Sequence, residues 1–175
     1  MFATIYLPNF YLQAALRHQS GLCEKPVALI EEQEKKPVII QLNEAAEKAG
    51  ICKGMTPSQA LARSLQVVIK VRARTQEKSI QEILLHYAFT LSPFVEATAP
   101  GICTVQFTDH RHLQAKAVRV IKQLAKCEIR AQAGITATPD TSFLAAHLAR
   151  PVLHIDNIKE FLAPLPIETL AIVDN

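Results

Sequence analysis

The sequence has no uninterrupted run of about 18 apolar residues, the length that a membrane-spanning helix requires, so no membrane span is predicted. Its first ten residues, MFATIYLPNF, contain neither a basic region nor a small-residue cleavage site, and we expect them to form a strand rather than a secretory signal. None of the four cysteines forms a C-x-x-C pair, which argues against zinc and favours free thiols in a reducing compartment. These absences predict a cytoplasmic protein.

Charged residues of either sign are also few, at 20% of the sequence. The formal net charge is only +3, which permits nucleic-acid binding without predicting it. The length of 175 residues fits one domain or a small two-lobed protein, and a hydrophobic content of 49% is enough for a substantial core.

Periodicity along the chain indicates alternating strands and helices. Residues 2–7 and 94–109 have strand character, the latter as a hairpin around Ala99-Pro100-Gly101, and residues 26–31 and 37–42 read as two antiparallel strands with a charged tip between them. Asn43 and Thr56 are expected to cap two short helices. Further strands are predicted at 66–71 and 128–136, and further helices at 10–19, 75–91, 114–127 and 142–150.

This order of elements predicts an α+β fold. The strand, helix, hairpin, helix and strand of the core match the ferredoxin-like βαββαβ arrangement, with a small helical insertion near residues 43–64. One cluster of basic residues stands out, where a strand ends and the long helix begins. We consider its members to be candidates for contacts with DNA phosphates: Lys70, Arg72, Arg74 and Lys78.

Several segments, taken in order, resemble the Y-family (UmuC/DinB-like) translesion DNA polymerases. GICKGMTPSQALA is similar to their G-V-x-x-G-M-x-x-x-x-A element, AGITATPDTSFLAAHLA to G-I-A-x-N-K-x-L-A-K-x-A, and FLAPLPIETL to the linker before their helix-hairpin-helix thumb. The N-terminal LPNFYLQAALRH resembles the ImuB-type branch, which is regarded as non-catalytic. The resemblance implies a palm at 1–40 and 66–150, a fingers-like insertion at 41–65, and a linker at 151–175 toward a thumb that would follow.

Active members of that family hold two Mg²⁺ ions with three carboxylates, because phosphoryl transfer needs the developing charge to be neutralised. Matching the family's D-x-D-x-F-F to this sequence places Tyr6 and Pro8 at its two aspartates. Matching its S-x-D-E-A-x-L-D places Gly101 and Ile102 at the Asp-Glu pair. No acid stands at these positions, so the resemblance implies that there is neither a catalytic site nor a metal cofactor.

The positions that would contact the incoming nucleotide are degenerate as well. The family's Y-E-A-R falls on residues 44–47, where Glu44 and Glu47 replace the Tyr and Arg, and its L-A-K lysine is matched to Ala146. By resemblance we expect a scaffold in the SOS response to DNA damage, which joins DNA, an error-prone or replicative polymerase and the sliding clamp.

Two other interpretations stay open at this stage. The chain could be an active nucleotidyltransferase with a relocated metal site, for which Glu96, Asp109 and Asp140 are the available acids. It could instead be a ferredoxin-like module that binds only protein partners.

Overall fold

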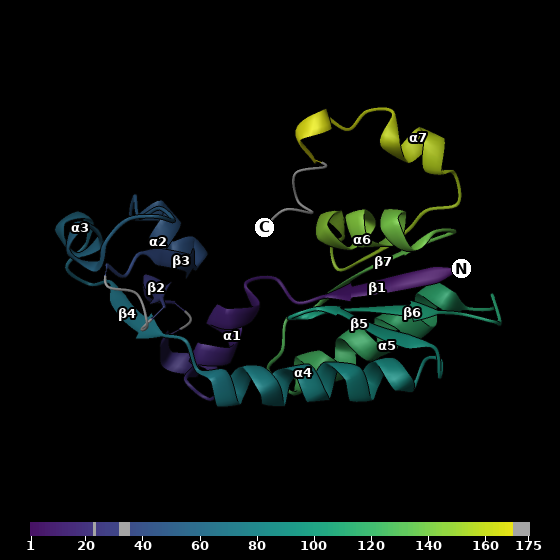
Figure 1. Ribbon diagram of the computed structural model, residues 1–175, viewed down its shortest axis with the longest axis horizontal. Coiled ribbons are helices and arrows are strands. Elements are labelled where there is room, and N and C mark those ends of the chain that lie inside the picture. The colour runs from purple at the N-terminus through teal and green to yellow at the C-terminus, as the bar shows by residue number, and fades with distance from the viewer. Residues whose placement is uncertain (23, 32–35, 170–175) are drawn as a thin grey trace. The chain divides into compact units, whose positions relative to one another are not determined.

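A computed structural model describes residues 1–22, 24–31 and 36–169 (Figure 1). The chain forms two compact units, Asn9–Ile80 and the combination of Met1–Pro8 with Gln81–Asn175. We call them the inserted unit and the sheet unit. No helix among the described residues is long and apolar enough to cross a membrane.

The sheet unit is built on five strands in the order β5-β6-β1-β7-β8. Its central strand, β1 (Phe2–Tyr6), is antiparallel to β6 (Ile102–Gln106) and to β7 (Gln132–Thr136). The edges are β5 (Val95–Ala99), antiparallel to β6, and β8 (Val152–His154), parallel to β7. Together with α4 (Arg74–Phe89) and α5 (Leu113–Lys126), the strands β1, β5, β6 and β7 confirm the predicted ferredoxin-like order.

Helices cover both faces of this sheet. Figure 1 shows α6 (Pro139–Leu148) on one face, and α5 and the second half of α4 on the other. The strands alternate accordingly: Ile5, Val105 and Ile135 are fully buried in the core, whereas Thr4 turns toward Ser142 of α6. The face under α6 carries the candidate site.

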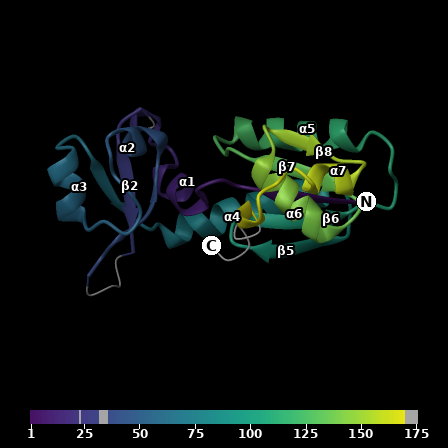
Figure 2. The ribbon, with the colours of Figure 1, turned by 90° about the horizontal axis from the view of Figure 1, so that it is seen from above.

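The inserted unit contains a separate sheet, β3-β2-β4, whose central strand β2 is labelled in Figure 2. Strand β2 (Val27–Ile30) pairs antiparallel with β3 (Ile39–Leu42) and parallel with β4 (Val68–Val71). Its helices are α1 (Phe10–Leu16), the 3₁₀ turn η1 (Ser20–Leu22), α2 (Glu44–Lys48) and α3 (Pro57–Arg63).

Both predicted helix caps are confirmed. Asn43 accepts a hydrogen bond from the Ala46 N–H at the start of α2, and Thr56 forms a capping box with Gln59 at the start of α3. Asn43 Oδ1 also accepts from the Val27 N–H, which ties α2 to β2. The charged tip predicted between β2 and β3 falls largely on residues 32–35, outside the described residues.

The compact units have different bounds from the predicted segments. The strands β2, β3 and β4 were assigned to the palm segments 1–40 and 66–150 or their border, but they form a sheet of their own with the helices of residues 41–65. The segment 151–175 was expected to be a linker, yet its β8 extends the main sheet and is followed by α7 (Ile158–Leu162). Local periodicity could not distinguish these alternatives, because strand partners are chosen by long-range packing.

Candidate functional site

The candidate site lies at the carboxyl end of β1, in the sheet unit. Tyr6, the last residue of β1, is paired with Ile102 on β6 and with Gln132 on β7. The next residue, Leu7, donates its N–H to the Gly101 carbonyl oxygen at 2.9 Å. The structure therefore brings together three of the positions matched to catalytic acids, Tyr6, Gly101 and Ile102. The fourth, Pro8, is two residues beyond Tyr6.

Backbone geometry explains the glycine at this point. Gly101 has φ 75°, in the left-handed region that costs a residue with a Cβ about 1 kcal/mol or more. It closes the tight turn between β5 and β6, and its N–H donates to Gln81 Oε1 of α4 at 2.7 Å. The Gly101 backbone is therefore held by the Leu7 N–H and the Gln81 side chain, and no acidic side chain takes part in these two contacts.

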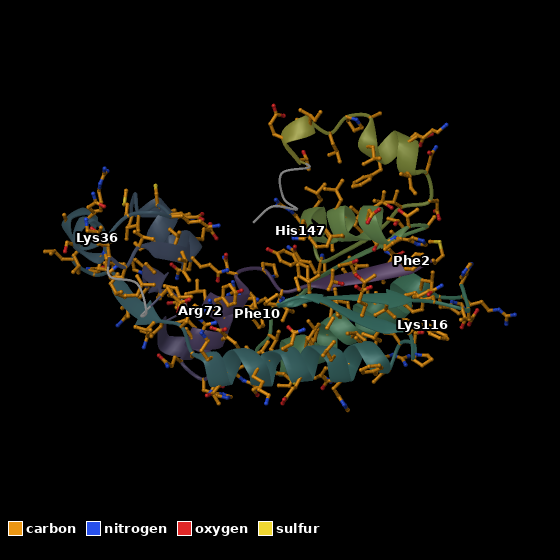
Figure 3. All side chains as sticks on the ribbon, viewed as in Figure 1. Phe2, Phe10, Lys36, Arg72, Lys116 and His147 are labelled. Atoms are coloured by element: carbon orange, nitrogen blue, oxygen red, sulfur yellow. The ribbon has the colours of Figure 1, made fainter. Side chains whose placement is uncertain are left out.

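An aromatic stack occupies the α6 side of this site. The Tyr6 ring lies 3.9 Å from the ring of His147, with 25° between the planes, and Phe143 packs 4.5 Å from the same imidazole. Nδ1 of His147 donates to the Phe143 carbonyl oxygen at 2.9 Å. Figure 3 shows His147 projecting from α6 in this unit.

Burial keeps both stacked groups neutral. Desolvation raises the pKa of the Tyr6 hydroxyl above its ordinary value. Desolvation also lowers the pKa of His147, although the hydrogen bond to the Phe143 carbonyl works in the opposite direction. At neutral pH the site therefore presents two uncharged rings.

A row of hydroxyl groups crosses the sheet beside the stack, and sequence reasoning did not identify it. Thr98 Oγ1 lies 2.9 Å from Thr104 Oγ1, which lies 3.2 Å from Thr4 Oγ1, which in turn is 2.7 Å from Ser142 Oγ. The row ends where Ser142 donates to the Pro139 carbonyl oxygen at 2.7 Å. Threonine at alternate positions of neighbouring strands was the available signal. These neutral groups satisfy one another.

The residues present do not fit a two-Mg²⁺ centre, which requires converging carboxylate oxygens. Among the described residues no three His, Cys, Asp or Glu side chains gather in a metal-binding arrangement. Glu96 is exposed on β5 opposite Thr104, and Asp140 is in the first turn of α6.

Asp109, the third alternative acid, is engaged locally. Its Oδ1 accepts from the Arg111 N–H at 3.1 Å, and Lys116 Nζ lies 3.5 Å from its Oδ2. The Arg111 N–H, with a smaller contribution from Lys116, lowers the pKa of this carboxyl group. In the part of the chain that the structure describes, the relocated metal site thus has no cluster to support it.

The degenerate nucleotide positions are divided between the two units. In α2 of the inserted unit, Glu44 and Glu47 are exposed, and Glu44 pairs with Lys48 at 2.6 Å. The hydrogen bond from Lys48 lowers the pKa of Glu44.

Ala146, the position matched to the family lysine, is fully buried where α6 packs on Gly134. A lysine could not reach a ligand from there, so we correct this match. Counting G-I-A-x-N-K-x-L-A-K without a gap from Gly134 places the lysine at Phe143, whose ring contacts His147.

The basic cluster of the inserted unit is more heterogeneous than predicted. Arg72 donates from Nε and Nη2 to Glu77 at 2.9 and 2.6 Å, and from Nη1 to Glu31 at 2.8 Å. Its guanidinium also lies 3.8 Å from the centroid of the Tyr11 ring. The Glu77 hydrogen bonds raise the pKa of Arg72 further. Arg72 (Figure 3) is therefore a structural residue, which corrects its assignment as a phosphate contact.

The other three basic residues differ in availability. Arg74 shares Glu31 at 3.0 Å, but its side chain is 60% exposed. Lys78 is exposed and Lys70 half-buried, and neither makes an ion pair with any residue in the described part of the chain. These three can present charge to solvent.

Comparison with known proteins identifies the family to which the chain belongs. Residues 5–146 match the model of the IMS family, described as the impB/mucB/samB family. The chain belongs to this family. Its fold is that of Y-family DNA polymerases: an insertion ternary complex of Dbh DNA polymerase superimposes with a TM-score of 0.84 at 14% identity, over 96% of this chain and 53% of that chain. The DinB crystal structure from Sulfolobus solfataricus gives 0.82 at 14% identity, over 96% and 52%.

Two curated relatives align with this chain at a higher identity than these structures do. DNA polymerase IV of Ralstonia nicotianae is 23% identical over 171 residues, and DNA polymerase IV of Pseudomonas syringae pv. tomato is 23% identical over 172 residues. Each alignment covers 92% of this chain and 48% of the relative. The chain thus spans about half the length of the curated relatives it matches.

Proposed function

We propose that this protein is a non-catalytic, ImuB-type relative of the Y-family polymerases that acts as a DNA-contacting adaptor in translesion synthesis. The observation that supports the proposal is the end of β1, where Tyr6 pairs with Ile102 beside Gly101 and stacks on His147. The family resemblance matches Tyr6, Gly101 and Ile102 to acids. Without carboxylates there, the charge that develops during phosphoryl transfer has no metal ions to neutralise it.

In this proposal the sheet unit has the role of the palm and the inserted unit that of the fingers. Retaining the fold without the acids suits a scaffold, since a binding surface needs the shape and not the ions. The partners we propose are a primer–template, an error-prone or replicative polymerase, and the sliding clamp. DNA contact is supported by the similarity to an insertion ternary complex and a post-insertion binary complex of Dbh DNA polymerase.

Primer extension tests the loss of catalysis. With a labelled primer–template, the four dNTPs and Mg²⁺ or Mn²⁺, we expect no extension under conditions in which an active DNA polymerase IV extends the primer. The variant Gly101→Asp/Ile102→Glu should also be inactive, because Tyr6 still occupies the remaining carboxylate position. Its new glutamate would replace a side chain that is only 8% exposed. Metal-dependent extension by the unsubstituted chain would refute the proposal.

Salt-dependent DNA binding tests the adaptor role. Fluorescence anisotropy of a labelled primer–template should show affinity that falls as salt rises, with a slope near −0.9 per phosphate contact. Replacing Lys70 and Lys78 with Gln should make that slope shallower. Lys48→Gln/Lys53→Gln removes the same charge from the same unit and is the matched control. Equal losses from the two pairs would indicate a general charge effect and contradict our choice of residues.

A further inference from the structure

A second basic surface lies on α5, far along the chain from the cluster at residues 70–78. The helix has four basic residues, Lys116, Arg119, Lys122 and Lys126, and no acidic residue between its ends. At 3.6 residues per turn, the last three fall within an arc of roughly 60°. They point away from the buried stripe of the same helix, which consists of Leu113, Ala117, Val120, Ile121 and Leu124. We call these four basic residues the α5 strip.

The charges of the α5 strip are largely available. Lys116 is near Asp109, at 3.5 Å, and Figure 3 shows it at the N-terminal end of the helix. Arg119, Lys122 and Lys126 are exposed and make no hydrogen bond or ion pair through their side chains with another described residue. The strip holds four of the eight Lys and Arg residues of the sheet unit. Fixed positive charge is therefore concentrated on one side of one helix.

The composition of the surface indicates the chemistry of its partner. None of the large hydrophobic side chains exposed in the described structure lies on α5, whereas the centre of a protein–protein interface is normally apolar or aromatic. Long cationic side chains on a helix with no large exposed hydrophobic residue suit a polyanion held by its charge. Successive members of the strip rise about 4.5 to 6 Å along the helix axis. Duplex DNA offers a phosphate about every 1.7 Å of its own axis, so several phosphates lie within reach.

We propose that the α5 strip binds the sugar–phosphate backbone of duplex DNA without reading its sequence. The proposal rests on the DNA contact of the proposed function but places a second contact elsewhere. In the sheet unit, α5 and α6 cover opposite faces (Figure 1). The Tyr6 ring stacks on His147, which belongs to α6. A duplex segment on α5 is thus separate from any strand that reaches the end of β1.

Anisotropy of a labelled blunt duplex, measured with the full 175-residue chain at about 50 to 200 mM NaCl, tests the proposal. Lys122→Gln/Lys126→Gln should make the slope of log affinity against log salt shallower by about 1.8, so that its loss of affinity is about 12-fold greater at 50 mM than at 200 mM. Lys122→Arg/Lys126→Arg keeps the charge and should bind like the unsubstituted chain. Arg150→Gln/Lys159→Gln removes two exposed charges of the same unit outside α5 and should cost less.

Three results would overturn the proposal. The first is an unchanged slope in Lys122→Gln/Lys126→Gln, and the second is an equal loss in Arg150→Gln/Lys159→Gln. The third is displacement of the duplex by polyglutamate as effective as by unlabelled duplex at equal charge, which would assign the strip to an acidic protein. If the unsubstituted chain does not bind at 50 mM NaCl, both DNA contacts fail. The loss of catalysis is judged separately, by primer extension.

Discussion

Replacing Gly134 with alanine is predicted to destabilise the sheet unit severely. Gly134 lies in β7, opposite Thr4 of β1, where α6 crosses the strand. A Cβ at this position would lie 2.6 Å from the Ala145 carbonyl carbon, and closer still to the Ala146 nitrogen and the Ser142 carbonyl oxygen. All three are backbone atoms, so no side chain can rotate to make room.

The size of the effect follows from the displacement required. Ordinary carbon contacts are about 3.5–4.0 Å, so α6 must move outward by roughly 1 Å. Overpacking of this kind costs about 1–3 kcal/mol or more. Moving α6 also lengthens the 2.7 Å hydrogen bond between Thr4 and Ser142, worth about 1 kcal/mol. We therefore expect the free energy of unfolding to fall by about 3 kcal/mol.

Guanidinium unfolding followed by circular dichroism measures this difference, and amide exchange of β1 and β7 locates it. Gly21→Ala is the matched control, because a Cβ there meets nothing within 4 Å and no positive φ is involved. Its effect should stay within about 0.5 kcal/mol. A Gly134→Ala protein as stable as the Gly21→Ala protein would refute the packing described for α6 on β7.

Three further predictions concern charge and reactivity. Arg72→Ala should destabilise the inserted unit by about 3 kcal/mol in denaturant unfolding, because it leaves Glu77, which is only 7% exposed, without its cation. Adding Glu77→Gln to this variant should recover part of the lost stability. No recovery would contradict the ion-pair explanation. Burial lowers the pKa of His147 below its unfolded value of about 6.5, so its contribution to stability should be complete above that pH and decrease as the pH falls toward the folded pKa. His147→Phe should flatten this pH dependence in thermal melts between about pH 7 and 5. An unchanged slope would exclude His147 as the source of the dependence. Burial raises the pKa of Cys103 to about 12, so a thiol reagent should modify the exposed Cys52 quickly and Cys103 only upon unfolding. Peptide mass spectrometry measures the modification at each site. Rapid modification of Cys103 in the native protein would show that β6 is less buried than described.

Local sequence signals predicted the elements whose determinants are local. The caps at Asn43 and Thr56 depend on residues within three positions. The strand at β6 was predicted from its own strand-forming residues, although Ile102–Val105 are buried on both faces of the sheet. The match of Tyr6, Gly101 and Ile102 to one site also came from sequence, because the motifs fix which residues of β1 and of the hairpin must be adjacent.

Features that depend on distant partners were not predictable in this way. Arg72 looked like a phosphate contact because Glu31, 41 positions away, gave no sign of being its partner. The parallel pairing of β2 with β4 needs the helices between them as a crossover, which periodicity alone does not reveal. The Tyr6–His147 stack joins β1 to a helix near the other end of the chain.

The central position of β1 has a consequence for the order of folding. Its partners β6 and β7 follow roughly 100 and 130 residues later, so the sheet cannot form early in synthesis. The inserted unit lies between β1 and β6 in the sequence. A hydrogen bond of 3.2 Å from Arg17 to Ser79 brings residues near the two ends of this unit together. If this unit folds first, the flexible loop between β1 and β6 becomes about four times shorter. Closing the shorter loop costs about 1.2 kcal/mol less chain entropy. In pulse-labelled exchange, protection of β2 should therefore precede that of β1. The insertion would then act as an internal folding aid for the sheet that surrounds it in sequence.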